Sequence, residues 1–118
     1  MGVYVFKSKH GEFMKIGHYA KLNAWSRVAH RGFNSCICPT ELTNRVMVSD
    51  LELLRWFPDL KKTDEKMLHK QCNQFSKGGE WFSMEALVKV DEIMSVRQLV
   101  DCSMTCSLEA ALRTRRRL

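Results

Sequence analysis

The chain has 118 residues, a formal net charge of +6 and a sequence pI near 9.2. This length fits one domain with a modest hydrophobic core and excludes a catalytic unit joined to a large recognition domain. No apolar run is long enough to cross a bilayer or resembles a secretory signal, so we expect an intracellular protein, cytoplasmic or nuclear, without a membrane partner. The positive charge favours a polyanionic partner, because Lys and Arg gain affinity for phosphates by releasing counterions.

The first 16 residues predict a β-hairpin. Residues 3–6 and 13–16 are apolar and β-prone, and residues 8–12 between them carry the polar, glycine-containing chemistry of a turn. With an even loop, alternation places Tyr4, Phe6, Phe13 and Lys15 on one face, and Val3, Val5, Met14 and Ile16 on the other. The aliphatic face is expected to be core. The opposite face either carries a site built on Tyr4 and Lys15, or Tyr4 merely packs and the Lys15 stem lies along an exposed strand.

The hairpin is followed by a predicted helix that starts with Asn23 as N-cap and runs to about Arg31. Its buried stripe is expected to be Leu22, Trp25, Val28 and Ala29. Asn23, Arg27 and Arg31 then share a polar face. Arg27 is therefore free either to meet a ligand or to lie in solvent.

Residues 32–50 are expected to be irregular, with residues 45–48 as a candidate short strand. Residues 51–57 predict a third strand that Pro58 ends, although their spacing also suits a helical turn. Cys36-x-Cys38 lies in the irregular stretch and resembles a fragment of a metal site. The remaining cysteines, Cys72, Cys102 and Cys106, are scattered. We therefore expect reduced thiols rather than a structural zinc site or a disulfide framework.

Thr63 predicts the N-cap of a helix that runs to about Phe75, with Asp64 and Glu65 in its first turn. Glu65 and His69 are four residues apart, so both side chains can point at one site. The alternatives are that Glu65 only stabilises the helix dipole and that His69 is a satisfied or solvated histidine.

Gly78-Gly79 is expected to end that helix, and residues 80–82 form a short extended piece at an edge of the core. Ser83 is then expected to cap a helix to about Cys102, and Ser107 a final short helix with a basic end. The stripe of the longer helix is Leu87, Val90, Ile93, Met94 and Leu99. The basic end, formed by Arg113 and residues 115–117, is a nucleic-acid patch, a targeting signal or a solvated terminus.

Taken together, five short motifs resemble the GIY-YIG nuclease superfamily, and most closely its viral and phage branch, whose second triplet reads Lys-Ile-Gly. In this chain they are Gly2-Val3-Tyr4, Lys15-Ile16-Gly17, Arg27, residues 65–69 (EKMLH) and residues 79–82 (GEWF). The resemblance covers residues 2–82. It implies an α/β (α+β) fold, with a small three-stranded antiparallel sheet flanked by helices in residues 1–82. A C-terminal helical extension, residues 83–118, is expected to pack on the same domain.

The resemblance also implies an activity, the hydrolysis of DNA phosphodiester bonds with one Mg²⁺ or Mn²⁺ ion. By similarity, Tyr4 is the general base or positions the attacking water, Arg27 stabilises the phosphate in the transition state, and Glu65 binds the metal. DNA rather than a small molecule is the expected substrate, in a protein of viral or phage type. The alternative is a catalytically degenerate domain of the same type that binds DNA or serves a structural, virion-associated role.

Lys15 departs from the superfamily, which more usually has a second tyrosine there. An ammonium beside Tyr4 is expected to favour the phenolate and so to assist catalysis. His18 and Tyr19 are alternative sources of the missing proton-transfer or hydroxyl group. Arg31 and His69 are further accessory candidates, and Glu80 stands near the place of a late polar residue, often asparagine, in many members.

Overall fold

The computed structural model describes residues 1–30, 32–34 and 45–115. Its strands are β1 (Gly2–Ser8), β2 (Phe13–Tyr19), β3 (Phe33–Asn34), β4 (Arg45–Val46), β5 (Leu51–Pro58), β6 (Ser76–Gly78) and β7 (Trp81–Ser83). Its helices are α1 (Lys62–Gln71), α2 (Ala86–Val96) and α3 (Leu108–Arg115), with 3-10 turns η1 (Ala24–Arg27), η2 (Val48–Asp50), η3 (Asn73–Phe75) and η4 (Ser103–Thr105). The chain is thus an α+β protein, as expected. Among the described residues, no helix is long and apolar enough to cross a membrane.

The main sheet is antiparallel and has five strands in the order β5-β1-β2-β7-β6, so the expected three-stranded sheet is wrong. The two additional strands come from residues 76–83. Gly78 and Gly79 have positive φ values of 117° and 56°, and they turn the chain between β6 and β7 rather than ending a helix. Positive φ carries little steric cost in glycine, which allows this tight reversal.

The β1–β2 hairpin was predicted with the correct alternation. Val5 pairs with Ile16 and Phe6 with Lys15 across the two strands. The helix-side core contains the aliphatic face of the hairpin together with residues of β5, β7, α1 and α2; its buried members are Val3, Val5, Met14, Ile16, Phe57, Leu60, Leu68, Cys72, Phe82, Ala86, Val90 and Met94.

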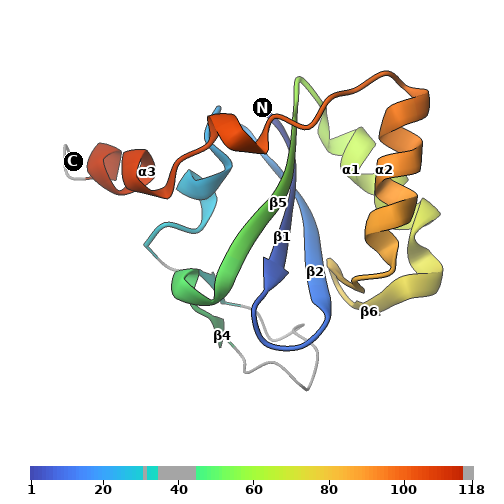
Figure 1. Cartoon of the computed structure of the whole chain (residues 1–118), viewed down its shortest axis with the longest axis horizontal. Helices are drawn as coiled ribbons and strands as arrows, with labels where there is room; N and C mark the ends of the chain where they lie inside the picture. Colours follow the sequence, from blue (N-terminus) through green and yellow to red (C-terminus); the bar gives the residue numbers. More distant parts are fainter. Residues whose placement is uncertain (31, 35–44, 116–118) are drawn as a thin grey trace.

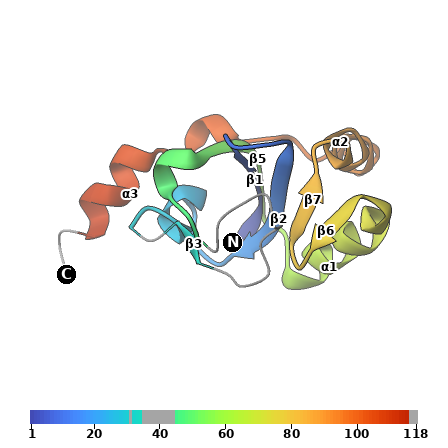
Figure 2. The same cartoon turned by 90° about the horizontal axis from the view of Figure 1, so that it is seen from below.

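The opposite face of the sheet is also buried, which the sequence did not reveal. Its buried members, here called the aromatic core, are Tyr4, Phe6, Ala24, Val28, Phe33, Val46, Leu51, Trp56 and Trp81. Figure 2 shows α1 and α2 on one side of the sheet, and η1, β3 and α3 on the other. A candidate site on the Tyr4 face therefore lies within or beside packed side chains, not on an open sheet surface.

Strand β5 was predicted, but its pattern does not alternate regularly. Its pairing with β1 shifts between Val5 and Phe6. Leu53 consequently packs against the aromatic core and Leu54 against the helix-side core, while Trp56 returns to the aromatic core. An extra residue in one strand reverses the alternation that follows it, and this explains why the spacing also suited a helical turn.

The helix predicted from Asn23 to Arg31 is only a short 3-10 turn, η1. Asn23 is the N-cap as expected, and its Oδ1 accepts a hydrogen bond from the Trp25 amide. Leu22, however, is 82% exposed and not part of the buried stripe. Arg31 lies outside the described residues, as do Cys36, Cys38 and residues 116–118 of the basic end.

Helix α1 begins at Lys62, with Lys61 rather than Thr63 as N-cap. The Asp64 carboxylate accepts the Lys61 amide at 2.8 Å, which fixes this earlier start. The helix ends at Gln71 instead of continuing to Phe75, and residues 73–75 form the 3-10 turn η3. Glu65 and His69 nevertheless lie one turn apart on the same helix, as predicted.

The helix predicted over residues 83–102 spans only Ala86–Val96, and Ser83 lies in β7. Gln98 adopts a positive φ of 59°, and Leu99 donates its amide to the Met94 carbonyl at 2.8 Å. This left-handed ending closes α2 before residue 102. The final helix, α3, begins at Leu108 as expected, with the Ser107 hydroxyl accepting the Ala110 amide at 3.1 Å.

Candidate functional site

The candidate site lies where β2 loses its pairing with β7. The ladder between these strands ends at Lys15 and Trp81, followed by one hydrogen bond from the Ile16 amide to the Glu80 carbonyl at 3.0 Å. The Ile16 carbonyl is instead paired with His69 Nε2 of α1 at 2.8 Å. A carbonyl only accepts, so His69 carries a proton on Nε2. His69 thereby holds α1 against the edge of β2, which is a structural role.

This attachment brings Glu65, one helical turn earlier, to the same edge of β2. Glu65 is 2% exposed, and Lys62 Nζ lies 3.5 Å from its Oε2. His69 Nε2 lies 3.7 Å from its Oε1. Oε2 has no hydrogen-bond partner among the described residues. Burial, then the negative charge of Glu80, raise the pKa of Glu65 above its ordinary value.

Glu80, in the turn between β6 and β7, forms a second carboxylate at the site. Its side chain lies within hydrogen-bonding reach of the Glu65 side chain. Its Oε1 also lies 3.0 Å from Lys15 Nζ. Burial opposes its ionisation, but the charge and hydrogen bond of Lys15 outweigh this effect and lower the pKa of Glu80. The site therefore combines a buried carboxyl group whose pKa is raised with a second carboxyl group whose pKa is lowered.

Tyr4 reaches the site from β1, and its side chain is 2% exposed. Burial first, and then the charge of Glu80, raise its pKa well above the ordinary tyrosine value, although Arg27 acts in the opposite direction. The expectation that Lys15 favours the Tyr4 phenolate is therefore wrong. The Lys15 ammonium is paired with Glu80, so Tyr4 stays a neutral hydroxyl that can donate a hydrogen bond.

The glycine of each triplet makes room for an aromatic ring. Gly17 lies opposite Tyr4 in the hairpin, and a Cβ added there would lie 2.2 Å from Tyr4 Cζ and Oη. At Gly2, an added Cβ would lie 2.6 Å from the Phe57 carbonyl oxygen and 2.8 Å from the ring of Trp56. Side chains at these two positions would displace the neighbouring ring or backbone. The triplets therefore have a packing reason for glycine that is independent of any catalytic role.

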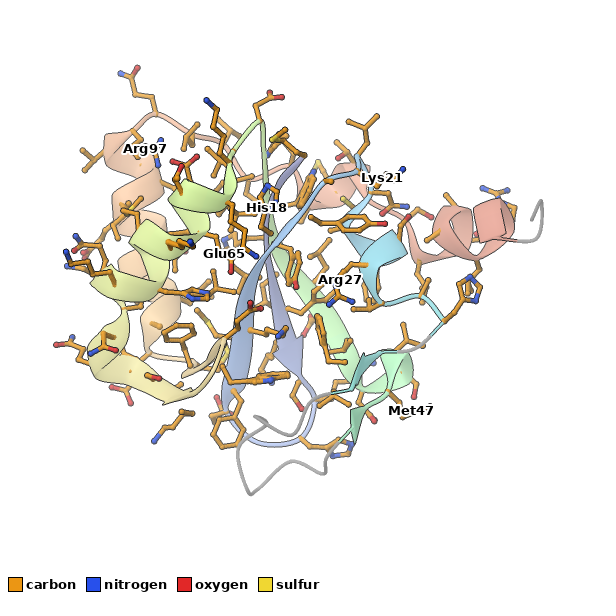
Figure 3. The ribbon with its side chains drawn as sticks, turned by 180° about the vertical axis from the view of Figure 1, so that it is seen from behind. His18, Lys21, Arg27, Met47, Glu65 and Arg97 are labelled. Atoms are coloured by element: carbon orange, nitrogen blue, oxygen red, sulfur yellow. The ribbon has the colours of Figure 1, made fainter. Side chains whose placement is uncertain are left out.

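Arg27 approaches Tyr4 from η1 and is exposed. Its guanidinium carbon lies 5.7 Å from the centre of the Phe33 ring, and a side-chain hydrogen bond to Tyr4 contributes to the lowering effect on the tyrosine pKa. Figure 3 shows Arg27 and Glu65 coming from opposite flanks of the β1–β2 hairpin. The Arg27 guanidinium is more accessible to an incoming anion than the buried Lys15 ammonium.

Phe33 and Trp81 are the site residues that sequence reasoning missed. Lys15 Nζ lies 4.7 Å from the centre of the Phe33 ring and 5.8 Å from that of Trp81. Phe33 also stacks on Tyr4, with ring centroids 6.0 Å apart. Phe33 follows Gly32 in a two-residue strand within a stretch without periodicity, so no local pattern signalled it. Trp81 was recognised only as part of an extended core segment.

Two accessory candidates, His18 and Tyr19, have contacts of their own. His18 points to the helix-side face, where its Nε2 lies 3.2 Å from the Leu60 carbonyl oxygen. Tyr19 is partly buried against the aromatic core. Arg31, as noted, lies outside the described residues. The structure thus brings together Tyr4, Lys15, Arg27, Glu65, His69 and Glu80, whereas His18 and Tyr19 make the other contacts just described.

No family model, curated protein or solved structure matches this chain. In the described part of the chain, no group of three or more His, Cys, Asp or Glu side chains is arranged to hold a metal ion. Cys72, Cys102 and Cys106 are free thiols. The site itself offers a carboxyl pair, a buried tyrosine hydroxyl and the cations Lys15, Arg27 and Lys62.

Proposed function

We propose that this protein is a metal-dependent endonuclease of the GIY-YIG type that hydrolyses phosphodiester bonds in DNA. One observation carries the proposal: side chains from separate elements gather at one place, with the Arg27 guanidinium of η1 and the Lys15 ammonium of β2 lying 5.7 and 4.7 Å from the centre of the Phe33 ring, which stacks on Tyr4 of β1. Glu80 pairs with Lys15 there, and Glu65 of α1 adjoins Glu80. Positive net charge supports a polyanionic substrate. The small fold has little chain for reading base edges, which favours limited sequence specificity.

The carboxyl groups fit a divalent ion such as Mg²⁺ or Mn²⁺. Mg²⁺ is typically bound by one or two carboxylates, with water and substrate phosphate oxygens completing its octahedral shell. Glu65 offers a buried oxygen that lacks a hydrogen-bond partner, and Glu80 adjoins it. When bound, such an ion lowers the pKa of a coordinated water and offsets charge on the phosphate.

The proposed roles of Arg27 and Tyr4 follow from their exposure and charge. Arg27, exposed and always protonated, offers paired N–H donors to the oxygens of a phosphate. Tyr4 is neutral at physiological pH, and it therefore positions the attacking water or a phosphate oxygen by hydrogen bonding instead of removing a proton. The sequence left both roles open for Tyr4; its burial favours the positioning role.

The test is cleavage of supercoiled plasmid and branched DNA by the full chain in Mg²⁺ or Mn²⁺. Glu65→Gln and Arg27→Ala should each lower the cleavage rate by about 10²-fold or more, the cost of losing a group that stabilises transition-state charge. Glu92→Gln, an exposed carboxylate on α2, is the matched control and should cleave normally. Absence of cleavage, or unchanged rates in both site variants, would refute the enzyme proposal.

One observation favours a second candidate, a degenerate domain that binds DNA without cutting it. Tyr4 is almost fully buried, and Lys15 is committed to Glu80 rather than available to Tyr4. Binding that weakens steeply with salt, without turnover in either metal, would identify this function. A protein with neither cleavage nor DNA affinity would instead point to the structural role.

A further inference from the structure

We infer that Glu80 is a second ligand for the divalent cation, which Glu65 and Glu80 hold jointly, and that the Lys15 ammonium competes with the cation for Glu80. The inference rests on the proposed metal dependence and extends it to a residue, Glu80, and a competing charge, Lys15. It concerns cation binding by the protein alone, so it can be tested without DNA and without activity.

The first support is the approach of two carboxyl groups from separate parts of the chain. Glu65 comes from α1 and Glu80 from the β6–β7 turn, and their side chains lie within hydrogen-bonding reach of each other. The Glu65 side chain is only 3% exposed, so water provides little screening. Two carboxylates this close repel each other unless a proton or a cation lies between them. A divalent cation satisfies both charges at once.

The second support is the oxygen that has no partner. Glu65 Oε2 is buried and makes no hydrogen bond with the described residues. Its nearest cation, Lys62 Nζ at 3.5 Å, belongs to a side chain that is 62% exposed. A buried polar oxygen without a partner is rare and costs free energy, and a metal ion or its coordinated water would remove that cost.

The third support is the position of Lys15. Its ammonium lies 3.0 Å from Glu80 Oε1 and 4.7 Å from the centre of the Phe33 ring. The ring gives the ammonium a favourable contact that does not depend on Glu80, because an aromatic face attracts a cation. The Lys15 ammonium can therefore lose its ion pair with Glu80 when a divalent ion binds and still remain over the Phe33 ring.

The donor set selects the kind of ion. Both ligands are carboxylate oxygens, which suit Mg²⁺ and Mn²⁺. His69 Nε2, the nearest nitrogen, donates to the Ile16 carbonyl and is therefore not free to ligate. Water completes the coordination shell, as is usual for Mg²⁺.

The experiment measures Mn²⁺ binding to the full chain without DNA. Calorimetry gives the affinity, and the electron paramagnetic resonance signal of free Mn²⁺ gives an independent measure of it. Glu80→Gln and Glu65→Gln should each weaken binding about tenfold or more. Lys15→Met should tighten it about tenfold, since a positive charge next to a divalent ion is removed. Lys15→Gln serves the same purpose if the methionine variant does not fold. Glu92→Gln is the control and should bind as the unmodified protein does.

The results separate this inference from the proposed nuclease activity. Unchanged Mn²⁺ affinity in Glu80→Gln, with the fold intact by circular dichroism, would overturn the inference even if the protein cleaves DNA. Weaker affinity in Lys15 variants would overturn the competing role of the ammonium. Weaker affinity in both glutamine variants would support the two-carboxylate site even if no DNA is cut, in which case only the nuclease proposal falls.

Discussion

The Gly17→Ala substitution tests the contact between the two triplets, in which the Tyr4 ring packs against Gly17. The alanine Cβ would lie 2.2 Å from Tyr4 Cζ and Oη, whereas ordinary van der Waals contact begins near 3.4 Å. The Tyr4 ring would therefore have to move by the difference of these distances, about 1.2 Å. It is confined by Phe6, whose ring centroid is 5.3 Å away, and by Phe33.

Forced displacement of a packed ring costs about 1–3 kcal/mol of unfolding free energy. The expected effect of Gly17→Ala on the free energy of unfolding disappears or changes sign when the Tyr4 ring is absent. In a Tyr4→Leu background, which lacks the clashing ring atoms, Gly17→Ala should be neutral or stabilise by up to about 1 kcal/mol, because glycine inside a strand is entropically unfavourable. The two substitutions should therefore be strongly coupled.

The assay is a double-mutant cycle measured by urea denaturation, with the slope of unfolding free energy against urea checked for each variant. A coupling free energy of about 1–4 kcal/mol is therefore expected. Two results would refute the reasoning: a Gly17→Ala variant as stable as the unmodified protein, or the same destabilisation with and without the Tyr4 ring. Either would mean that the ring does not rest on Gly17.

Burial, then the charge of Glu80, raise the pKa of Tyr4 in the folded protein. The neutral Tyr4 hydroxyl therefore contributes its full stability below the unfolded tyrosine pKa near 10. Above that pH the contribution falls by about 1.4 kcal/mol per pH unit until the pKa of Tyr4 in the folded protein is reached. With Tyr19→Phe, Tyr4 is the one remaining tyrosine, and its near-ultraviolet tyrosinate absorbance should appear only with unfolding; ionisation near pH 10 in the folded variant would contradict this. Asn23→Ala should cost about 1–2 kcal/mol by urea denaturation, since Asn23 caps η1 and its Nδ2 donates to the Ser107 carbonyl at 2.7 Å. Exposed Ser26→Ala is its control, and equal effects of the two would disprove the cap.

Local patterns in the sequence determined the hairpin, its two faces and the starts of η1 and α3. The alternation of Val5 and Phe6 between faces follows from strand geometry, and the caps at Asn23 and Ser107 are contacts over a few residues. The shared position of Glu65 and His69 on one helix was predictable for the same reason: they are four residues apart.

Helix lengths and strand number were less predictable. Strand β7, which was expected only as an extended piece, pairs with β2 over a long sequence separation, and β6 joins the sheet by pairing with β7. Helix α2 ends where Gln98 takes a left-handed conformation, which glycine or asparagine signals more clearly than glutamine. The irregular spacing in β5 likewise depends on its register with β1.

The candidate site was likewise predictable in its residues but not in their surroundings. Tyr4, Lys15, Arg27 and Glu65 were identifiable from motifs, but only the tertiary structure decided their environment. Packing of the aromatic core buries Tyr4 and raises its pKa, and the β6–β7 turn brings Glu80 to Lys15 and so removes the ammonium from the tyrosine.

The features that depend on residue type and short spacing could be predicted from the sequence, because the contacts that determine them lie within one helical turn or one hairpin. The pKa of a tyrosine, the partner of a lysine and the meeting of Glu65 with Glu80 depend on burial and on distances between segments far apart in the chain. Only folding sets those quantities, and here they turn a predicted tyrosine–lysine pair into a lysine–carboxylate pair beside a neutral tyrosine.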